Sequence, residues 1–155
     1  MKFRMLLSAL LLSACAVFVS GWKDAESKAA SPAEVSAAFF KAIIDGDTAA
    51  AAKLCAGDNA QQFAMELKEA CAEQKQKAAA DPKGEDAMVL SAIRNAKWEA
   101  KVDGDKAVAT MTFVFDINGQ KIEKENDQLK LPLKKVNGEW KIDADTIIAE
   151  ASKEK

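Results

Sequence analysis

The chain after residue 30 first shows the period of an amphipathic helix. Residues 31–34 read Ser-Pro-Ala-Glu, a capping box with proline at the first helical position, where its missing N–H costs nothing. Asp45-Gly46 supplies a stop signal. The apolar face of this predicted helix consists of Val35, Phe39, Ala42 and Ile43.

Two further helices are predicted in the first half. Asp47 is placed to cap a short one that runs through Leu54, and Gly57 ends it. Asp58 is expected to cap a longer helix, which residues 81–84 (Asp-Pro-Lys-Gly) close. The apolar face of the longer helix follows the spacing i, i+4, i+7 and i+8 at Phe63, Leu67, Ala70 and Cys71.

The second half changes to a period of two, which is typical of half-buried strands. Four alternating segments predict an antiparallel meander with inward side chains from Trp98 to Ile142. The pairs Asp103-Gly104, Asn118-Gly119 and Asn137-Gly138 separate the strands. They are typical of type I′ turns, because both central residues of such a turn need positive φ.

The third strand carries two irregular signals. The parity of Ile122 disagrees with that of Leu129, Leu131 and Leu133, which predicts a bulge within residues 123–128. Pro132 predicts that this strand lies at an edge or at a bulge, because proline cannot donate to the ladder. A brief helix is expected in the tail from Asp145.

Together these elements predict an α+β fold, with about three N-terminal helices packed on a curved, four-stranded antiparallel meander. A single domain of about 125 residues, 31–155, can bury roughly two thirds of its surface, which suffices for a core without metal or cofactor. No cofactor is expected.

The first residues have the pattern of a secretory signal peptide. Lys2 and Arg4 precede an apolar stretch, and residues 12–15 read Leu-Ser-Ala-Cys, which matches the bacterial lipobox. The thiol of Cys15 would receive the diacylglycerol and tie the protein to a membrane. The chain then divides into a signal peptide (1–14), a lipidated cysteine with its tether (15–30) and the domain (31–155).

Two alternatives to lipidation stay open. Residues 14–16 (Ala-Cys-Ala) also fit ordinary signal cleavage, which would remove Cys15. An uncleaved anchor is the other, although residues 5–20 are fewer than the ~20 apolar residues that a spanning helix needs. Ala16 in place of aspartate implies, by resemblance to enterobacterial lipoproteins, the outer membrane, with the domain facing the periplasm.

Composition excludes several classes of function. Without Lys2 and Arg4, 20 of the 22 basic residues remain against 24 acidic ones, and they form no basic stripe, so no nucleic acid partner is expected. The chain has no histidine and no tyrosine. Serine and cysteine hydrolase triads and histidine-bound zinc are therefore excluded, and we expect neither catalytic residues nor a metal site.

Cysteine usage fits an oxidising compartment. If Cys15 is acylated, Cys55 and Cys71 remain as an even pair, and we expect a disulfide that joins adjacent helices. Such a fifteen-residue loop could contribute ~3 kcal/mol. A redox-active pair and two buried free thiols stay open as alternatives.

A family resemblance rests on the two ends of the domain. Residues 31–34, the run Ala-Phe-Phe-Lys-Ala at 38–42, Asp-Gly-Asp at 45–47 and the closing Val-Asn-Gly-Glu-Trp-Lys-Ile-Asp at 136–143 carry it. The chain resembles small exported lipoproteins with a lumazine-binding-like domain of unknown function, in the nuclear-transport-factor-2-like (cystatin-like) superfamily. The resemblance implies a curved sheet around the helices, enclosing a cone-shaped pocket. That superfamily includes isomerases, dehydratases and proteins that only bind.

Two surfaces are candidates for binding. A small apolar ligand could occupy the cone, although the same side chains are typical of an ordinary core; they are Phe39, Phe63, Trp98, Met111, Phe113 and Trp140. The opposite face of the second strand is uncharged and β-rich, which predicts a homodimer or a strand shielded by lysine stems. This second surface consists of Val108, Thr110, Thr112 and Val114.

The leading hypothesis is a non-enzymatic binding or accessory module in the bacterial cell envelope. One alternative is a carboxylate-based isomerase or dehydratase, which needs an inward acid with a raised pKa. The related isomerases use a tyrosine that this chain lacks, and Asp116 has outward parity before a turn. The other alternative, a protein-partner or structural module, predicts a filled interior and an exposed apolar patch.

Overall fold

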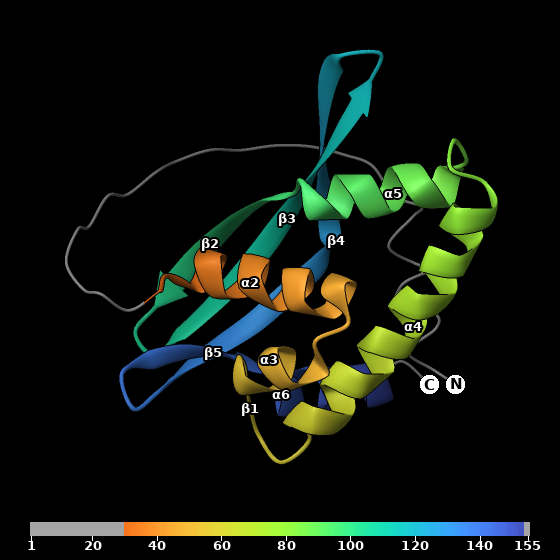
Figure 1. Ribbon diagram of the computed structural model, residues 1–155. Coiled ribbons are helices and arrows are strands. Elements are labelled where there is room, and N and C mark those ends of the chain that lie inside the picture. Colours follow the sequence, from red (N-terminus) through yellow and green to blue (C-terminus); the bar gives the residue numbers. More distant parts are fainter. Residues whose placement is uncertain (1–29, 154–155) are drawn as a thin grey trace.

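The computed structural model describes residues 30–153. The predicted signal peptide, Cys15 and almost all of the tether lie outside the described residues. Figure 1 shows the order of the elements. They are α2 (Pro32–Asp45), α3 (Thr48–Lys53), β1 (Cys55–Ala56), α4 (Ala60–Ala80), α5 (Glu85–Arg94), β2 (Lys97–Asp103), β3 (Lys106–Ile117), β4 (Gln120–Val136), β5 (Glu139–Asp143) and α6 (Ala144–Lys153).

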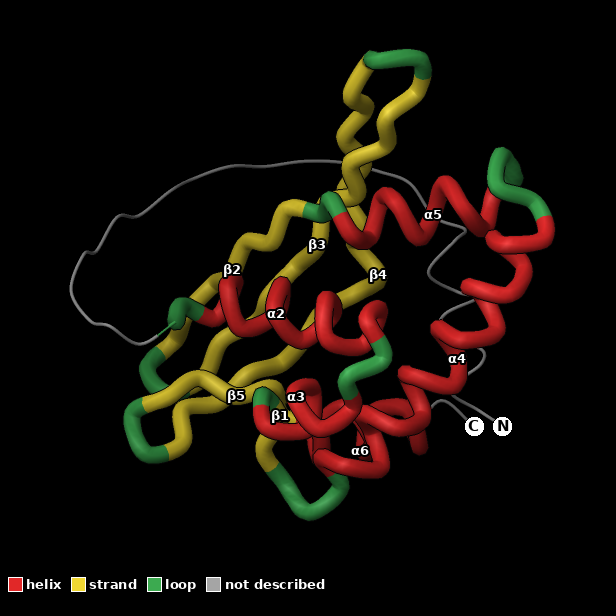
Figure 2. Tube along the Cα trace, in the orientation of Figure 1, coloured by secondary structure: helices red, strands yellow, loops and turns green. Residues whose placement is uncertain are grey.

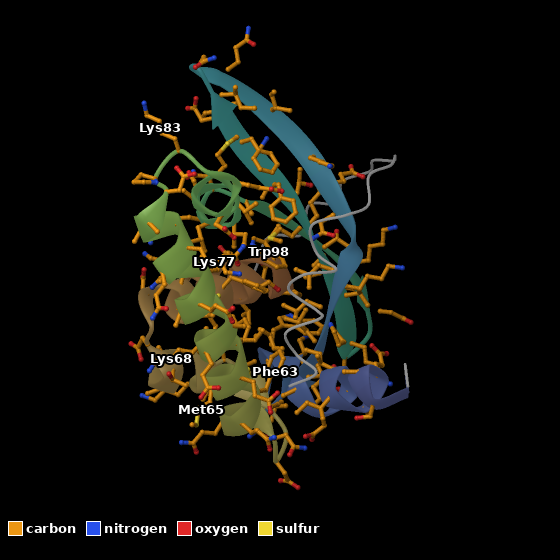
Figure 3. The ribbon with its side chains drawn as sticks, turned by 90° about the vertical axis from the view of Figure 1, so that its right-hand side faces the viewer. Phe63, Met65, Lys68, Lys77, Lys83 and Trp98 are labelled. Carbon is orange, nitrogen blue, oxygen red and sulfur yellow. The ribbon has the colours of Figure 1, made fainter. Side chains whose placement is uncertain are left out.

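The strands form one mixed sheet in the order β1-β5-β4-β3-β2 (Figure 2). Strands β2 to β5 are the predicted antiparallel meander, and β1 adds a short fifth strand parallel to β5. Helices α2, α4 and α5 lie on one side of this sheet in the view of Figure 3. The α+β class is therefore confirmed, while the sheet has one strand more than predicted.

Helix α2 forms as its capping box predicts. The Ser31 N–H donates to Glu34 Oε2 at 2.7 Å, and the Glu34 N–H donates to Ser31 Oγ at 3.3 Å. The hydrogen bonds from the backbone and side chain of Ser31 hold the pKa of Glu34 below its ordinary value. Gly46 ends the helix in the left-handed region with φ +82°.

The predicted caps of the next two helices have different outcomes. Asp47 caps α3, because its Oδ1 accepts from the Ala50 N–H at 2.9 Å. Asp58 was expected to cap α4, and this is wrong: the capping position is Asn59. The backbone N–H and the Nδ2 of Asn59 both donate to Asp145 Oδ1, at 3.3 and 2.9 Å. A contact with the far end of the chain therefore sets where α4 begins.

Helix α5 is missing from the sequence prediction, which placed only three helices before the strands. Its buried face is narrow, because only Val89 and Ala92 are fully covered. Gly84 occupies the capping position without a side-chain bond. The remaining local signal is the charge order, with Glu85 first and Arg94 last, which suits the helix dipole.

Two of the three hairpin turns are as predicted. Asn118-Gly119 and Asn137-Gly138 have positive φ at both central residues, between +52° and +84°. The first turn is different: Asp103 pairs with Lys106, so Gly104 and Asp105 are its central residues. Only Gly104 has positive φ there, and the type I′ prediction for this turn is wrong.

Strand β4 has the predicted irregularity. Its register against β3 shifts between Thr110 and Met111, whose partners are Lys130 and Asn126, so residues 127–129 have no partner in β3. The bulge thus lies at the end of the predicted range. The edge alternative for Pro132 is wrong, because β4 lies between β3 and β5. The bulge alternative is closer to the structure: Pro132 follows the bulge and precedes the first residue that pairs with β5, Leu133.

The interior consists of two clusters of buried side chains. The main core joins α2, α3 and α4 to the sheet, and it includes Phe39 and Phe63, whose rings stack with centroids 5.7 Å apart. The hairpin core is smaller and lies where α5 packs on β3; its buried members are Ala92, Met111 and Phe113. Trp98 is partly buried and packs against both.

Cys55 and Cys71 are both free thiols in the structure, and both belong to the main core. The predicted disulfide is not formed, and the open alternative of two buried thiols describes the arrangement. Burial raises the pKa of Cys55 to about 12 and outweighs the opposing charge of Lys141. Burial likewise raises the pKa of Cys71. Both groups therefore stay protonated at neutral pH.

Candidate functional site

The six side chains predicted to line a pocket take the places of core residues. Phe39, Phe63 and Trp140 are buried in the main core, and Met111 and Phe113 are buried in the hairpin core. Trp98 is the exception, since it is only partly buried, and Figure 3 shows it between the helices and the sheet. The six residues are thus divided between two packed clusters.

An open groove of about 410 Å³ lies between α2, the end of α5 and the start of β2. One wall is the ring of Trp98, which packs against Phe40 with centroids 5.0 Å apart. Three charged residues stand among apolar ones in its lining. The lining residues are Ala37, Ala38, Lys41, Ile44, Asp45, Ile93, Arg94, Ala96 and Trp98.

The hairpin of β3 and β4 projects beyond α5 at the top of Figure 1. One of its faces carries an apolar row that we call the hairpin strip. Phe115 and Ile122 are paired across the strands, and the rings of Phe113 and Phe115 lie 5.8 Å apart. At the start of the row Phe113 is 7% exposed, whereas Ile117 and Ile122 near the tip are 39% and 47% exposed. Its members are Phe113, Phe115, Ile117 and Ile122.

Both backbone edges of the projecting part are unpaired among the described residues. The ladder between β2 and β3 ends at the pair Lys97–Thr112. The ladder between β4 and β5 begins only at Leu133. From Phe113 to Glu125 the two strands therefore pair with each other alone among the described strands.

The outward face of β3 is only partly open. Val114 is buried and Thr112 is half-buried, while Val108 and Thr110 are exposed. Charged residues flank the row, since Thr110 pairs with Glu99 on one side and with Lys130 on the other. A homodimer through this face stays a prediction, which light scattering of the Thr112→Lys variant would test.

Among the side chains that the structure describes, none is an acid that points inward. Every described Asp and Glu side chain is at least partly exposed. Asp116 Oδ1 accepts from the Gly119 N–H at 3.0 Å, so it belongs to the hairpin turn. No group of three metal-ligating side chains occurs within the part of the chain that the structure describes.

Asp143 is the carboxylate with the densest set of partners. It lies beside Lys134 Nζ at 2.8 Å and accepts from Thr146 Oγ1 at 2.9 Å. Burial raises its pKa, but the hydrogen bonds from Lys134 and Thr146 and the lysine charge outweigh burial and hold the pKa below its ordinary value. Its surroundings suit a cap of α6, not an acid catalyst.

Comparison with protein-family models, with curated proteins and with solved structures returned no match. The resemblance to lumazine-binding-like lipoproteins therefore stays a prediction from the residues that carry it. Among residues 30–153, no helix combines the length and the apolar character that crossing a membrane requires.

Proposed function

We propose that the chain is an envelope lipoprotein, anchored through Cys15, whose domain is a non-catalytic binding or accessory module. We further propose that it recognises an extended segment of a partner protein through the hairpin strip. The observation that carries this proposal is the apolar row that leaves the hairpin core and continues to the exposed tip.

An exposed row of this kind costs free energy unless something covers it. Burial of apolar surface contributes about 25 cal/mol per Å², and a hairpin that projects from its domain cannot bury the row by itself. The partner would therefore contribute the apolar surface that the domain lacks. Ile117 and Ile122 are the residues with the most to gain, since both are large and exposed.

The free edges favour a polypeptide as the occupant. An extended segment can add to an unpaired strand edge through main-chain hydrogen bonds, and its alternate side chains then meet the strip. Charged residues of both signs, such as Lys121 and Glu123, line the other face and discourage indiscriminate pairing. A partner with alternating apolar residues fits both features.

The other two candidate functions have less support. A small ligand in the cone needs space at six residues that pack in two clusters. A carboxylate enzyme needs an acid in apolar surroundings, and the buried polar side chains among the described residues are Ser36, Gln74 and Asn126. Core packing of the six predicted pocket residues, together with an exposed apolar row, is the combination expected of a protein-partner module.

Site-specific photo-crosslinking in the native envelope tests the proposal. A benzophenone side chain at Ile122 should give a discrete adduct heavier than the monomer, because this position lies on the strip. The same group at Lys121, on the other face of the same strand, should give none. Adducts of equal yield from both positions, or none from either, would contradict the proposal.

A variant near the exposed tip of the hairpin separates binding from folding. Ile117→Ser should lower the yield of the Ile122 adduct at least severalfold, while it lowers the free energy of unfolding by only about 1 kcal/mol, because Ile117 is 39% exposed and lies outside both cores. Val102→Ser is the matched control, because Val102 is 56% exposed on β2 and lies outside the strip. It should leave the adduct unchanged.

A further inference from the structure

We propose that the groove between α2 and the α5–β2 junction is a second binding site, which takes a small organic anion with a planar apolar body. This site is separate from the hairpin strip and does not depend on the proposed function. Its residues come from α2 and from the α5–β2 junction, two segments that are distant in the sequence, so only the folded domain assembles it.

The apolar part of the site matches a planar body. Small side chains leave the space open, since Ala37 and Ala38 come from α2 and Ala96 follows α5. Ile44 and Ile93 add branched apolar surface. The volume of about 410 Å³ lies within the range of roughly 300–1,000 Å³ that is typical of small-molecule sites.

Trp98 supplies the wall on which a planar ligand would stack. Its ring is only partly buried, and Phe40 contacts it from α2 at a centroid distance of 5.0 Å. The contact with Phe40 and the packing against both cores hold the indole in place. A fixed aromatic wall loses little side-chain entropy when a ligand stacks on it.

The charged part of the site favours an anion. Lys41 and Arg94 stand against a single carboxylate, Asp45, so the groove has an excess positive charge on a chain whose net charge is −2. Arg94 is only loosely held, because its guanidinium lies 3.8 Å from Asp45 and both side chains are at least half exposed. Lys41 makes no ion pair with the described residues, so its ammonium can turn to a ligand.

The helix ends at the groove do not reverse this preference. A helix C-terminus carries partial negative charge, and α2 and α5 both end here. Some of the terminal carbonyls are occupied, however: Ile43 O accepts from the Gly46 N–H, and Ser91 O accepts from the Asn95 N–H and Nδ2. Lys41 and Arg94 carry full charges on side chains that line the groove, whereas each helix end carries only about half an elementary charge.

Fluorescence titration of the folded protein tests the site with two matched probes. 8-Anilinonaphthalene-1-sulfonate has a planar apolar naphthalene ring and an anionic sulfonate, and N-phenyl-1-naphthylamine has the same aromatic body without the charge. The sulfonate should bind saturably with one site per chain and at least fivefold more tightly than the neutral probe. Binding that does not saturate, or equal affinity for the two probes, would overturn the proposal.

Charge variants separate the groove from the rest of the surface. Lys41→Glu should weaken the sulfonate about tenfold and leave the neutral probe unchanged. Lys68→Glu is the matched control, because Lys68, labelled on α4 in Figure 3, is exposed and does not line the groove, so the change should affect neither probe. Equal losses from both variants would mean a general charge effect and would overturn the assignment.

Two further variants fix the location. Ala38→Trp should fill the groove and abolish binding of both probes, while circular dichroism verifies that the fold is intact. Trp98→Phe should remove most of the energy transfer from tryptophan to the bound sulfonate, whereas Trp140→Phe should not. Loss of probe binding in Ile117→Ser, with Ala38→Trp unaffected, would place the probe on the hairpin strip and refute the groove. That result would leave the partner proposal intact.

Discussion

The main core and the hairpin core lie under the same sheet, yet they differ in how completely they are covered. In the main core, Phe39, Ile43 and Ile142 are at most 1% exposed, since α2, α3 and α4 all contribute to it. The hairpin core has three buried members, and α5 is the helix that contributes to it. Stability therefore resides mainly in the first region.

The second region is where surface is left for binding. Both proposed sites, the hairpin strip and the groove, border the hairpin core through Phe113 and Trp98. Incomplete coverage is the physical reason, because one short helix cannot shield the long strands that extend past it. The comparison implies that damage to the main core lowers stability, whereas changes around the hairpin core alter recognition.

The largest effect is expected in the main core. Phe39→Ala should lower the free energy of unfolding by about 3–5 kcal/mol, because it leaves a cavity beside Phe63. Phe113→Ala should cost less, below about 3 kcal/mol, since the small hairpin core can relax around it. Urea denaturation of both variants measures the difference. Equal losses would show that the two regions are one cooperative core.

Gly57 gives the next largest effect. Its φ is +113°, and an added Cβ would lie 2.3 Å from Asp145 Oδ2, so Gly57→Ala must displace the carboxylate that holds Asn59. We expect a loss of about 2 kcal/mol or more by thermal denaturation. Gly104→Ala is the control: φ is +59° with nothing within 4 Å, so only the backbone cost of about 1 kcal/mol applies.

Asp143 should make the stability sensitive to acid. Its folded-state pKa lies below the ordinary value of 3.8, so its contribution is complete above pH 3.8 and is lost as the pH falls through the lower folded-state value. Asp143→Ala should cost about 1–3 kcal/mol at pH 7, because α6 loses its cap and Lys134 its partner. Asp143→Asn keeps a capping oxygen and should lose less. The difference in the free energy of unfolding between Asp143→Ala and wild type, measured by urea denaturation, should be smaller at pH 3 than at pH 7; an unchanged difference would refute this role.

The two buried thiols should react slowly in the folded protein. Because the pKa of Cys55 is raised to about 12, the thiolate is scarce, and Cys55 and Cys71 should resist Ellman's reagent at pH 8 in the native protein. A chain that starts at Trp22, unfolded without reductant, should then titrate two thiols. If no thiol reacts, Cys55 and Cys71 form the disulfide that the sequence predicts, and the free-thiol arrangement is wrong.

Local signals in the sequence were sufficient for several features that are decided locally, although the type of the first hairpin turn is an exception. The capping box fixes the start of α2, and paired Asn-Gly residues fix two turns because few other residues tolerate positive φ. The disagreement in parity between Ile122 and Leu129 revealed the bulge in β4. Each of these depends on residues a few positions apart.

Most of the other errors arose where residues distant in the sequence decide. Asn59 ends up before α4 because Asp145 binds it across the fold, and no pattern around Asp58 reveals that contact. Helix α5 has a narrow apolar face and no capping side chain, so its packing on β3 stabilises it. Strand β1 has two residues, and its pairing with β5 defines it.

The candidate sites show the same division. Alternating aromatic residues predicted an inward face correctly, but a pocket lining and a packed core have the same pattern, and only the position of the helices distinguishes them. The groove residues Ala37, Lys41 and Arg94 carry no motif. The sequence by itself determined the α+β class, the capped first helix and the meander, because these follow from short-range periodicity and backbone preference. The tertiary structure alone decided which apolar surface is covered, because coverage depends on contacts between elements far apart in the chain.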